Sequence, residues 1–277
     1  MSAKKRNSPN GVSFSGRMGS GKNYCGDLLQ KYVTSKSLGG DAVKAIQLSF
    51  GNGVKRFGMF LLGQPCFTNE EKETEIPEGF EYNIDMAVYR MFVSDDFTKT
   101  PTNDGWMKKW FCINKSNVCT YRQMIDIIAE GLKTHAPTTR GRLLQVLGTE
   151  IVREKIHQYV WVEILRREIA RCNKEKQRWI VTDARFPNEI CMIESLGGVC
   201  VYVDTIVPYN GTRDKNHPSE TALDGRMMHI IHNDRTTDSD TFIEFLLNGK
   251  WDEVCNRLKR LPIEVVGNSS RDLVGPD

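Results

Sequence analysis

A glycine-rich segment, GRMGSGK at residues 16–22, stands between two apolar stretches of different period. Val12 and Phe14 precede it and indicate a short strand over 12–15. Apolar residues at roughly helical spacing follow it and indicate a helix over about 23–35. A strand, a glycine turn and a helix in this order are typical of the phosphate-binding loop GxxxxGK, in which backbone N–H groups and a helix N-terminus face an anion. The segment therefore predicts an α/β fold with an anion site at its first βα turn.

The loop departs from the usual signature at one position. Ser or Thr usually follows the lysine, and its hydroxyl holds Mg²⁺, but this chain has Asn23. The amide oxygen of Asn23 is a hard ligand that Mg²⁺ accepts, either directly or through a bound water. Lys22 adds a full positive charge near the β- and γ-phosphates. The alternative is a glycine-rich turn that merely carries a solvent-exposed lysine.

A second candidate anchor follows the apolar run at 179–181, which is typical of a strand buried on both faces. Asp183 ends this run, as a metal-binding carboxylate does in many nucleotide-binding sheets. Arg185 comes two residues later and lies on the same side of an extended chain. A guanidinium at that place can bind two oxygens of one phosphate through two parallel N–H donors. The alternatives are a turn or capping role for Asp183 and an ordinary surface ion pair for Arg185.

The composition is that of a globular protein with an ordinary core. Of the 277 residues, 39% are hydrophobic and 26% are charged, with 38 basic against 35 acidic side chains. A net charge of +3 gives no argument for nucleic acid, and no apolar run approaches the roughly 18 residues that span a bilayer. The eight cysteines include no CxxC pair, and the polar start has no apolar leader. We expect a cytoplasmic protein with reduced thiols and without nucleic-acid or membrane partners.

The pattern along the chain predicts a mainly parallel sheet of about five strands flanked by helices in three layers. The expected strands lie at 12–15, 45–50, around 179–181, 198–204 and 227–232. The expected helices lie at 23–35, 121–133, 142–172 with a break near Gly148, 241–247 and 251–258. We expect a disordered head at 1–10, a domain at 11–262 and a flexible tail at 263–277. Within the domain, acidic and aromatic residues at about 66–120 predict an insertion that forms a lid or a subunit contact.

Five short segments resemble elements of the phage and viral-type deoxynucleoside monophosphate kinases of the P-loop kinase superfamily. They are SFGNGVKRF at 49–57, LLQVLGTEIVR at 143–153, DARFPNE at 183–189, HPSE at 217–220 and HNDRTTDSDTFIEFL at 232–246. Their order and spacing agree with that family over about residues 12–250. The family's loop often has Asp after the lysine, which is closer to Asn23 than Ser or Thr is. Gly51 and Asn52 stand where the family usually has an acidic residue.

The resemblance implies a P-loop kinase fold that transfers the γ-phosphoryl group of ATP, with Mg²⁺, to a deoxynucleoside monophosphate. Both substrates are anions, so catalysis depends on positioning and on neutralisation of charge. The catalytic candidates are Lys22, Asp183, Arg185 and Arg153, and the metal candidates are Asn23 and Asp183. The candidates for ATP binding are Gly16, Arg17, Met18, Gly19, Ser20, Gly21, Lys22, Asn23, Arg213 and Asn233. The candidates for acceptor binding are Lys55, Arg142, Gln145, Glu150, Arg153, Trp161 and Arg185.

Several candidates keep an alternative role. Trp161 suits a core position as well as a base contact, and Glu150 suits a helix N-terminus. Arg213 belongs to an expected lid at about 205–220, which closes over the triphosphate and excludes water, or to a plain solvated loop. Asn233 suits an adenine contact, a turn or a helix cap, and His217 is expected to be structural. A homodimer in the host cytoplasm, if the chain is viral, is compatible with the resemblance.

Three other functions fit the loop. The first is a P-loop kinase for another small phosphate acceptor, of the dephospho-coenzyme A type. The second is a nucleotide switch or DNA-motor ATPase, against which stand the missing NKxD guanine-reading element and the balanced charge. The third is a non-catalytic relative that binds ATP without turnover, suggested by Asn23. The measurements that separate them are acceptor choice, DNA-stimulated hydrolysis and turnover itself.

Overall fold

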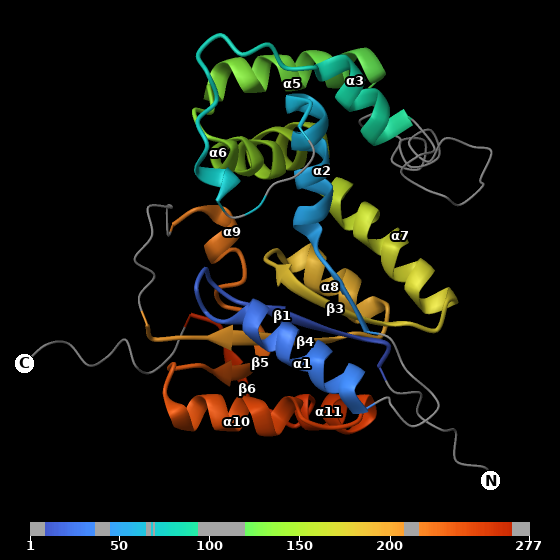
Figure 1. The fold of residues 1–277 in the computed structure, drawn as a ribbon, viewed down its shortest axis with the longest axis vertical. Coiled ribbons are helices and arrows are strands. Elements are labelled where there is room, and N and C mark those ends of the chain that lie inside the picture. Colours follow the sequence, from blue (N-terminus) through green and yellow to red (C-terminus); the bar gives the residue numbers. More distant parts are fainter. Residues whose placement is uncertain are drawn as a thin grey trace, which may run out of the picture. The chain divides into compact units, whose positions relative to one another are not determined.

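The computed structural model describes most of the chain in two compact units (Figure 1). The described residues are 9–36, 45–64, 68, 70–93, 120–207 and 216–267. The first unit comprises the described residues up to Phe50 and from Ile164 onward, and the second runs from Gly51 to Glu163. Several expected features lie outside the described residues. They are residues 208–215 of the lid expected at about 205–220, with Arg213, residues 94–119 of the expected insertion, and most of the expected head and tail.

The first unit is built on a six-stranded sheet, which confirms the α/β class with one strand more than expected. The strands are β1 (Gly11–Ser15), β2 (Ala45–Leu48), β3 (Arg178–Ala184), β4 (Val199–Asp204), β5 (Met227–His232) and β6 (Ile263–Val265). Their order is β2-β3-β1-β4-β5-β6, and the first five are parallel. Strand β6 pairs antiparallel with β5, with His229 opposite Ile263.

The sixth strand corrects the expected start of a flexible tail at residue 263. Ile263–Val265 extends the sheet, and the described chain continues to Gly267, whose preceding residue Val266 is buried. The run IEV is too short to give a strand signal by itself. It forms because the β5 edge offers unpaired backbone groups, and Pro262 O accepts from the N–H of Ile230 just before the pairing begins.

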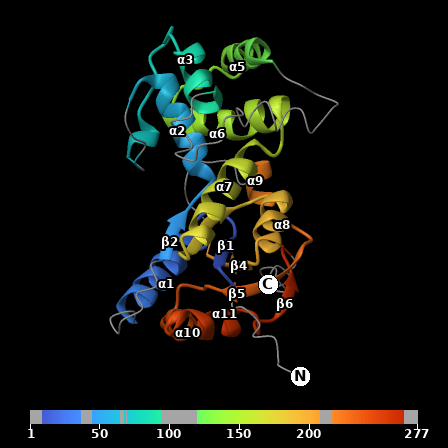
Figure 2. The same cartoon turned by 90° about the vertical axis from the view of Figure 1, so that its right-hand side faces the viewer.

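Helices cover both faces of the sheet (Figure 2). The helices of this unit are α1 (Lys22–Lys36), α7 (Val160–Lys174, which begins in the second unit), α8 (Pro187–Ser195), α9 (Pro218–Thr221), α10 (Thr237–Leu247) and α11 (Trp251–Leu258). Helices α1, α10 and α11 share one buried cluster with Ile180. The adjacent residue, Trp179, points to the opposite face, where Gly198 brings it against Ile193 of α8.

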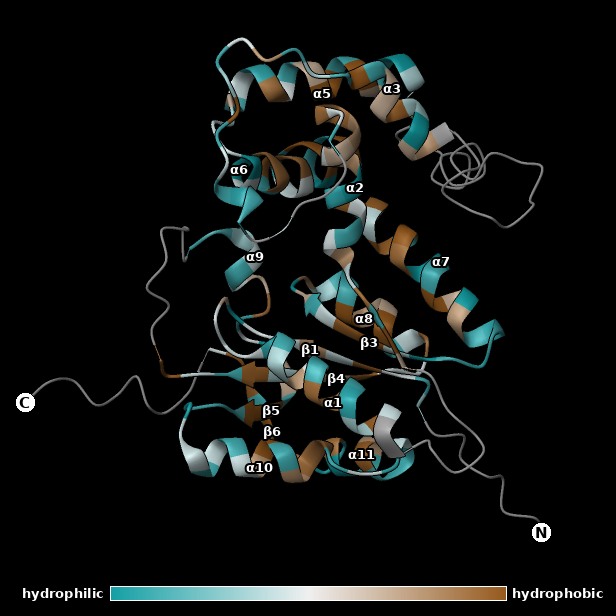
Figure 3. Cartoon of the chain, in the orientation of Figure 1, coloured by the Kyte–Doolittle hydropathy of each residue, from teal (hydrophilic) through white to brown (hydrophobic). Residues whose placement is uncertain are grey.

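The apolar residues of this unit gather on the strands and on the sheet-facing sides of the helices (Figure 3). Val12 and Phe14 of β1 and Ile180 and Val181 of β3 have no exposed surface, so the middle of both strands that lead to the candidate site is enclosed. Burial of this kind supplies the main driving force for folding, and it holds the strand ends in place.

The connections of the sheet mark one edge as the place for a ligand. From β1 the chain crosses through α1 to β2, and from the neighbouring β3 it crosses through α8 to β4 on the other side. Ligands of open α/β sheets bind beyond the carboxyl ends of two strands whose connections diverge in this way. The glycine segment follows β1 and Asp183 lies near the end of β3, so both belong to that edge.

The second unit is helical. Its described elements are α2 (Phe50–Leu62, which starts in the first unit), a 3₁₀ turn η1 (Glu71–Glu73), α3 (Ile84–Val88), the π-helical stretches η2 (Tyr89–Val93) and η4 (Val146–Ile156), α5 (Tyr121–His135) and α6 (Arg140–Gln145). Phe57 and Phe92 form an edge-to-face pair with ring centroids 5.5 Å apart in its core. Thr120 caps α5 in a reciprocal box with Gln123. This unit, Gly51–Glu163, includes more of the chain than the insertion expected at about 66–120.

Two local predictions were wrong. The strand expected to reach residue 50 ends at Leu48, because Phe50 begins α2 and its N–H donates to a carboxylate instead of a strand. The helical stretch expected to break near Gly148 runs through that residue and ends before His157. A Cβ on Gly148 would lie 3.5 Å from the side chain of Val54, which is an ordinary contact distance, so this glycine neither ends the helical stretch nor marks an unusually close approach.

Candidate active site

The glycine loop joins β1 to α1 in a shape that only glycine tolerates at its key positions. Gly16 and Gly21 have φ of 141° and 99°, conformations that other residues rarely adopt. A Cβ on Gly16 would collide with the carbonyl oxygen of Val203, and one on Gly21 would collide with the side chain of Asn233. The chain therefore turns tightly before α1, as a loop that presents backbone N–H groups to an anion must.

Asn233 and Arg235, which follow β5, hold the glycine loop through hydrogen bonds to its backbone. The Asn233 side chain, which is buried, donates through Nδ2 to the carbonyl oxygen of Ser20 at 2.9 Å. Arg235 donates through Nη2 to the carbonyl oxygen of Gly19 at 2.6 Å. The Asn233 Oδ1 atom accepts from the Arg235 N–H at 3.2 Å, so the two braces are linked. The sequence left an adenine contact, a turn and a helix cap open for Asn233, and in the structure both ends of its amide are engaged within the protein.

Lys22 is buried at the first position of α1, with 7% of its surface exposed. Its Nζ donates to the carbonyl oxygen of Arg17 at 2.7 Å, within the same loop. Desolvation, followed by the nearby charge of Arg185, lowers the pKa of Lys22 to about 7, although Glu220 and Asp183 act in the opposite direction. A buried lysine with so low a pKa lacks sufficient negative charge around it, and a phosphate would supply that charge.

Asp183 is held at the end of β3 by two donors. Its Oδ2 accepts from the Ser49 hydroxyl at 2.6 Å and its Oδ1 accepts from the Phe50 N–H at 2.9 Å. The chain between β2 and α2 thus fixes the orientation of the carboxylate. The half-buried carboxylate remains an oxygen ligand of the kind that Mg²⁺ prefers.

The oxygen atoms of Asp183 and Asn23 are the candidate protein ligands for Mg²⁺. In the part of the chain that the structure describes, no group of three or more His, Cys, Asp or Glu side chains could hold a metal ion. Mg²⁺ in phosphoryl-transfer enzymes usually needs only one or two protein oxygens, because substrate phosphates and water complete its shell. Asp183 and the exposed Asn23 offer such oxygens. The residues therefore fit a Mg²⁺ that arrives with a nucleotide.

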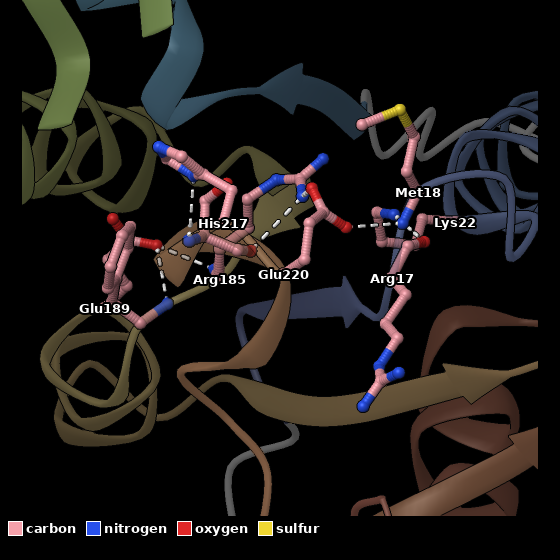
Figure 4. A network of polar contacts seen from close by, with 9 residues as sticks. Arg17, Met18, Lys22, Arg185, Glu189, His217 and Glu220 are labelled. Atoms are coloured by element: carbon pink, nitrogen blue, oxygen red, sulfur yellow. Dashed lines mark hydrogen bonds and ion pairs between the residues drawn. The ribbon is translucent and has the colours of Figure 1, made fainter. Parts of the chain in front are cut away.

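Arg185 lies directly after β3 and is held by two carboxylates (Figure 4). Its backbone N–H donates to Glu189 Oε2 at 2.8 Å, and the same oxygen accepts from the Phe186 N–H at 3.2 Å. Its Nη1 makes an ion pair with Glu220 and also donates to the carbonyl oxygen of Ser219 at 3.3 Å. The surface ion pair that the sequence left as an alternative for Arg185 is thus present, but its acidic partner is buried.

Glu220 connects Arg185 to the glycine loop. Its second oxygen, Oε2, accepts from the backbone N–H of Met18 at 2.7 Å (Figure 4). Arg17, the neighbour of Met18, makes its own ion pair at 2.9 Å with Asp224, which follows α9. Loop residues 17 and 18 are therefore both tied to the segment around α9.

Sequence reasoning missed five residues that contact the candidates. They are Ser49, Glu189, Glu220, Asp224 and Arg235. Four of them stand inside or beside the quoted segments SFGNGVKRF, DARFPNE, HPSE and HNDR, so the only available signal was membership of a recognised segment. The pairings themselves join residues as far as 216 positions apart, and no local pattern reveals them.

The acceptor candidates other than Arg185 lie in the second unit. Arg142 makes an ion pair with Glu150 at 2.8 Å. Arg153 donates through Nη1 to the carbonyl oxygen of Gln158 at 3.5 Å. Lys55 and Gln145 are half-buried. The structure brings Arg142 and Glu150 together, which the sequence did not predict as a pair.

Trp161 occupies the core, the second of the two roles that the sequence left open. Only 2% of its surface is exposed, and its indole N–H donates to the carbonyl oxygen of Gly148 at 2.9 Å. A buried Trp with its polar atom satisfied is a packing residue. In this structure Trp161 offers no face on which a base could stack.

Comparisons with known proteins bear on the whole arrangement. A family model described as deoxynucleotide monophosphate kinase matches residues 12–241, which span the glycine loop, Asp183, Arg185 and the braces after β5. The chain is also similar to the deoxynucleoside-5′-monophosphate kinase of Escherichia phage T5, with 29% identity over 231 residues, 80% of this chain and 87% of the phage protein. Among the described helices, none has the length and apolar character needed to cross a membrane.

Proposed function

The chain belongs to the deoxynucleotide monophosphate kinase family, and from this membership we infer that it phosphorylates deoxynucleoside monophosphates to diphosphates with ATP as donor. The single observation that carries the inference is the family match over residues 12–241. It is a phosphotransferase whose substrates are small anionic nucleotides. Two of the three alternatives, a kinase for another phosphate acceptor and a non-kinase ATPase, are not favoured by these comparisons.

We assign the donor phosphates to the glycine loop and Lys22. The Met18 N–H donates to Glu220 and the Ser20 N–H to the Arg17 carbonyl oxygen, so we assign the anion to the other amides of the loop, which Gly16 and Gly21 hold in a fixed conformation. Lys22 becomes fully charged once a phosphate offsets its desolvation, so the binding of ATP and the protonation of Lys22 favour each other. The braces from Asn233 and Arg235 keep the loop carbonyls turned away from that anion.

We propose Asp183 and Asn23 as the residues that hold Mg²⁺. The ion, when bound with ATP, neutralises the charge that develops on the transferring phosphoryl group. Asp183 is oriented for this role by Ser49 and Phe50, and its carboxylate carries the charge that a cation requires. Asn23 contributes its amide oxygen or holds a water.

We propose that Arg185 and Arg153 bind the acceptor phosphate and the phosphoryl group in transfer. Arg185 suits this because its guanidinium stands beside the loop that receives the donor phosphates. Lys55, Arg142, Gln145 and Glu150 are assigned to acceptor binding on the resemblance. Donor and acceptor repel each other, so guanidinium groups that neutralise both lower the barrier without any protein nucleophile. Trp161 is assigned to the core.

The proposed function is tested with a panel of all deoxynucleoside and nucleoside monophosphates, dephospho-coenzyme A and DNA, each with ATP and Mg²⁺, followed as ADP formed. We expect ADP with one or more deoxynucleoside monophosphates, and loss of that signal in Lys22→Ala. Lys31→Ala, which removes an exposed lysine of the same helix, is the matched control and should keep wild-type turnover. ADP formed only with dephospho-coenzyme A, or only with DNA, would contradict the proposal. A homodimer in the cytoplasm stays a prediction, which sedimentation of the purified chain and imaging of the tagged chain test.

A further inference from the structure

Glu220 accepts from two donors that belong to different parts of the first unit. One is the backbone N–H of Met18 in the glycine loop, and the other is Nη1 of Arg185 after β3. The Glu220 side chain is 5% exposed, so both contacts are shielded from water and neither is a weak surface pair. One carboxylate therefore bridges the loop and the arginine.

Among the described residues, the contacts that hold the Arg185 guanidinium use one of its nitrogens, Nη1. Nη1 contacts Glu220 and the carbonyl oxygen of Ser219, whereas Nε and Nη2 make no hydrogen bond with any residue that the structure describes. The Arg185 side chain is 25% exposed, so part of it still reaches solvent. An arginine edge with two parallel N–H donors is the arrangement that binds an oxyanion bidentately.

The short helix α9 presents Glu220 in a fixed orientation. Pro218 opens the helix, and His217 caps it by accepting from the Ser219 N–H through Nδ1 at 3.2 Å. His217 is itself buried, and its ring also contacts the Ser219 hydroxyl at 2.8 Å. The Glu220 N–H donates to the His217 carbonyl oxygen at 2.7 Å. The segment HPSE thus forms a rigid support for one carboxylate.

We propose that Glu220 is a positioning residue of the kinase reaction: it fixes Arg185 relative to the glycine loop and leaves the Nε–Nη2 edge free for a phosphoryl oxygen pair. The proposal rests on the proposed function, because it gives Arg185 a phosphate to bind. Lys and Arg side chains lose rotamer freedom when they bind, and an arginine already held at one nitrogen loses less of it. Glu220 would therefore act on turnover through Arg185, without touching substrate.

A different role for Glu220 is a latch that occupies phosphate donors until ATP displaces it. The rigid support by α9 and the burial of the carboxylate favour the positioning role, because a latch must leave its site. The two roles predict opposite effects of removing the carboxylate. Positioning predicts slower turnover, and a latch predicts tighter ATP binding or faster turnover.

The test compares the steady-state kinetics of Glu220→Gln, Glu220→Asp, Arg185→Ala and the double variant Glu220→Gln/Arg185→Ala with the wild type. We expect kcat to fall about 10- to 100-fold in Glu220→Gln, with KM for ATP changed less than about threefold. Glu220→Asp should show a similar loss, because it keeps the charge and loses the reach. The double variant should be no slower than Arg185→Ala, because the proposed effect of Glu220 on turnover passes through that arginine.

Glu194→Gln is the matched control, since it removes a carboxylate that pairs with Arg226 on the exposed side of α8. It should keep wild-type kcat. If the wild type phosphorylates deoxynucleoside monophosphates and Glu220→Gln stays within twofold of it, the positioning proposal is wrong while the function stands. Additive losses in the double variant, or ATP bound more tightly by Glu220→Gln, would also overturn it. Should Glu220→Gln fail to fold, Glu220→Asp and its double variant with Arg185→Ala carry the same comparison. A wild type that leaves every monophosphate unchanged overturns both the proposed function and the positioning role. An active wild type with an equally active Glu220→Gln overturns only the positioning role.

Discussion

The substitution Gly21→Ala probes whether the shape of the glycine loop is required. An alanine at a φ of 99° is strained by about 1–2 kcal/mol relative to glycine. Its Cβ also meets the Asn233 side chain, which is buried and bonded to Ser20. Displacing Asn233 costs that hydrogen bond and leaves a buried carbonyl oxygen without its donor, roughly a further 1–3 kcal/mol.

The matched control is Gly197→Ala, in the turn between α8 and β4. Gly197 has a φ of 79°, and a Cβ placed on it would meet nothing within 4 Å. It therefore carries the backbone strain without the collision. The difference between the two variants isolates the contact with Asn233, which we put at about 2 kcal/mol in the free energy of unfolding.

Two assays read this difference. In thermal unfolding, Gly21→Ala should melt about 4–8 °C below Gly197→Ala, at roughly 2–4 °C per kcal/mol for a chain of this size. In equilibrium titration with ATP, Gly21→Ala should bind at least about tenfold more weakly than the wild type, and Gly197→Ala should bind like it. Equal melting temperatures together with wild-type ATP affinity in Gly21→Ala would refute the account of the loop.

Three further predictions follow from the same unit and its neighbour. The pKa of Lys22 in the free protein is about 7, so Lys22 is cationic below that pH and neutral above it. We therefore expect kcat/KM for ATP to fall as the pH rises through about 7, and a flat profile to pH 9 would contradict this. Arg185→Ala should lower kcat much more than ATP affinity, as stopped-flow binding and steady-state turnover would show, since its charge is needed in the transition state; equal losses in both would argue against it. Trp161→Phe should lower the free energy of unfolding by about 1–3 kcal/mol, measured by urea titration, through the lost bond to Gly148, and should leave base preference unchanged.

Much of the sheet was predictable because its signals are local. Met227–His232 and Trp251–Leu258 lie where the pattern of apolar residues placed a strand and a helix. The glycine loop was found from its GxxxxGK pattern between a short strand and a helix, and Asp183 from its place at the end of an apolar run. These features need no knowledge of what packs against them.

The rest depends on contacts between residues far apart in the chain. Strand β6 exists because it completes an edge of the sheet, and its three residues carry no pattern of their own. Gly148 suggested a break, but the helical stretch Val146–Ile156 runs through it. A tryptophan suits a base-binding site and a core equally well, so the residue type alone does not decide the role of Trp161. Its burial in the structure decides for the core.

The site shows the same limit. Asp183 was identified from its place after a strand, whereas its partner Ser49 lies 134 positions away. Glu220 stood in a recognised segment, yet its bond to Met18 joins residues 202 positions apart. Residue types and local order predict which groups carry charge, and only the fold shows which groups those charges meet.

The central claim is that the loop and Lys22 hold ATP so that its terminal phosphoryl group passes to a deoxynucleoside monophosphate. ATP labelled in the γ-phosphoryl group, incubated with the protein, Mg²⁺ and each deoxynucleoside monophosphate, tests it most directly through separation of the labelled products. The account predicts label in a deoxynucleoside diphosphate with the wild type and none with Lys22→Ala. Label that stays in ATP, or appears only as inorganic phosphate, would contradict it.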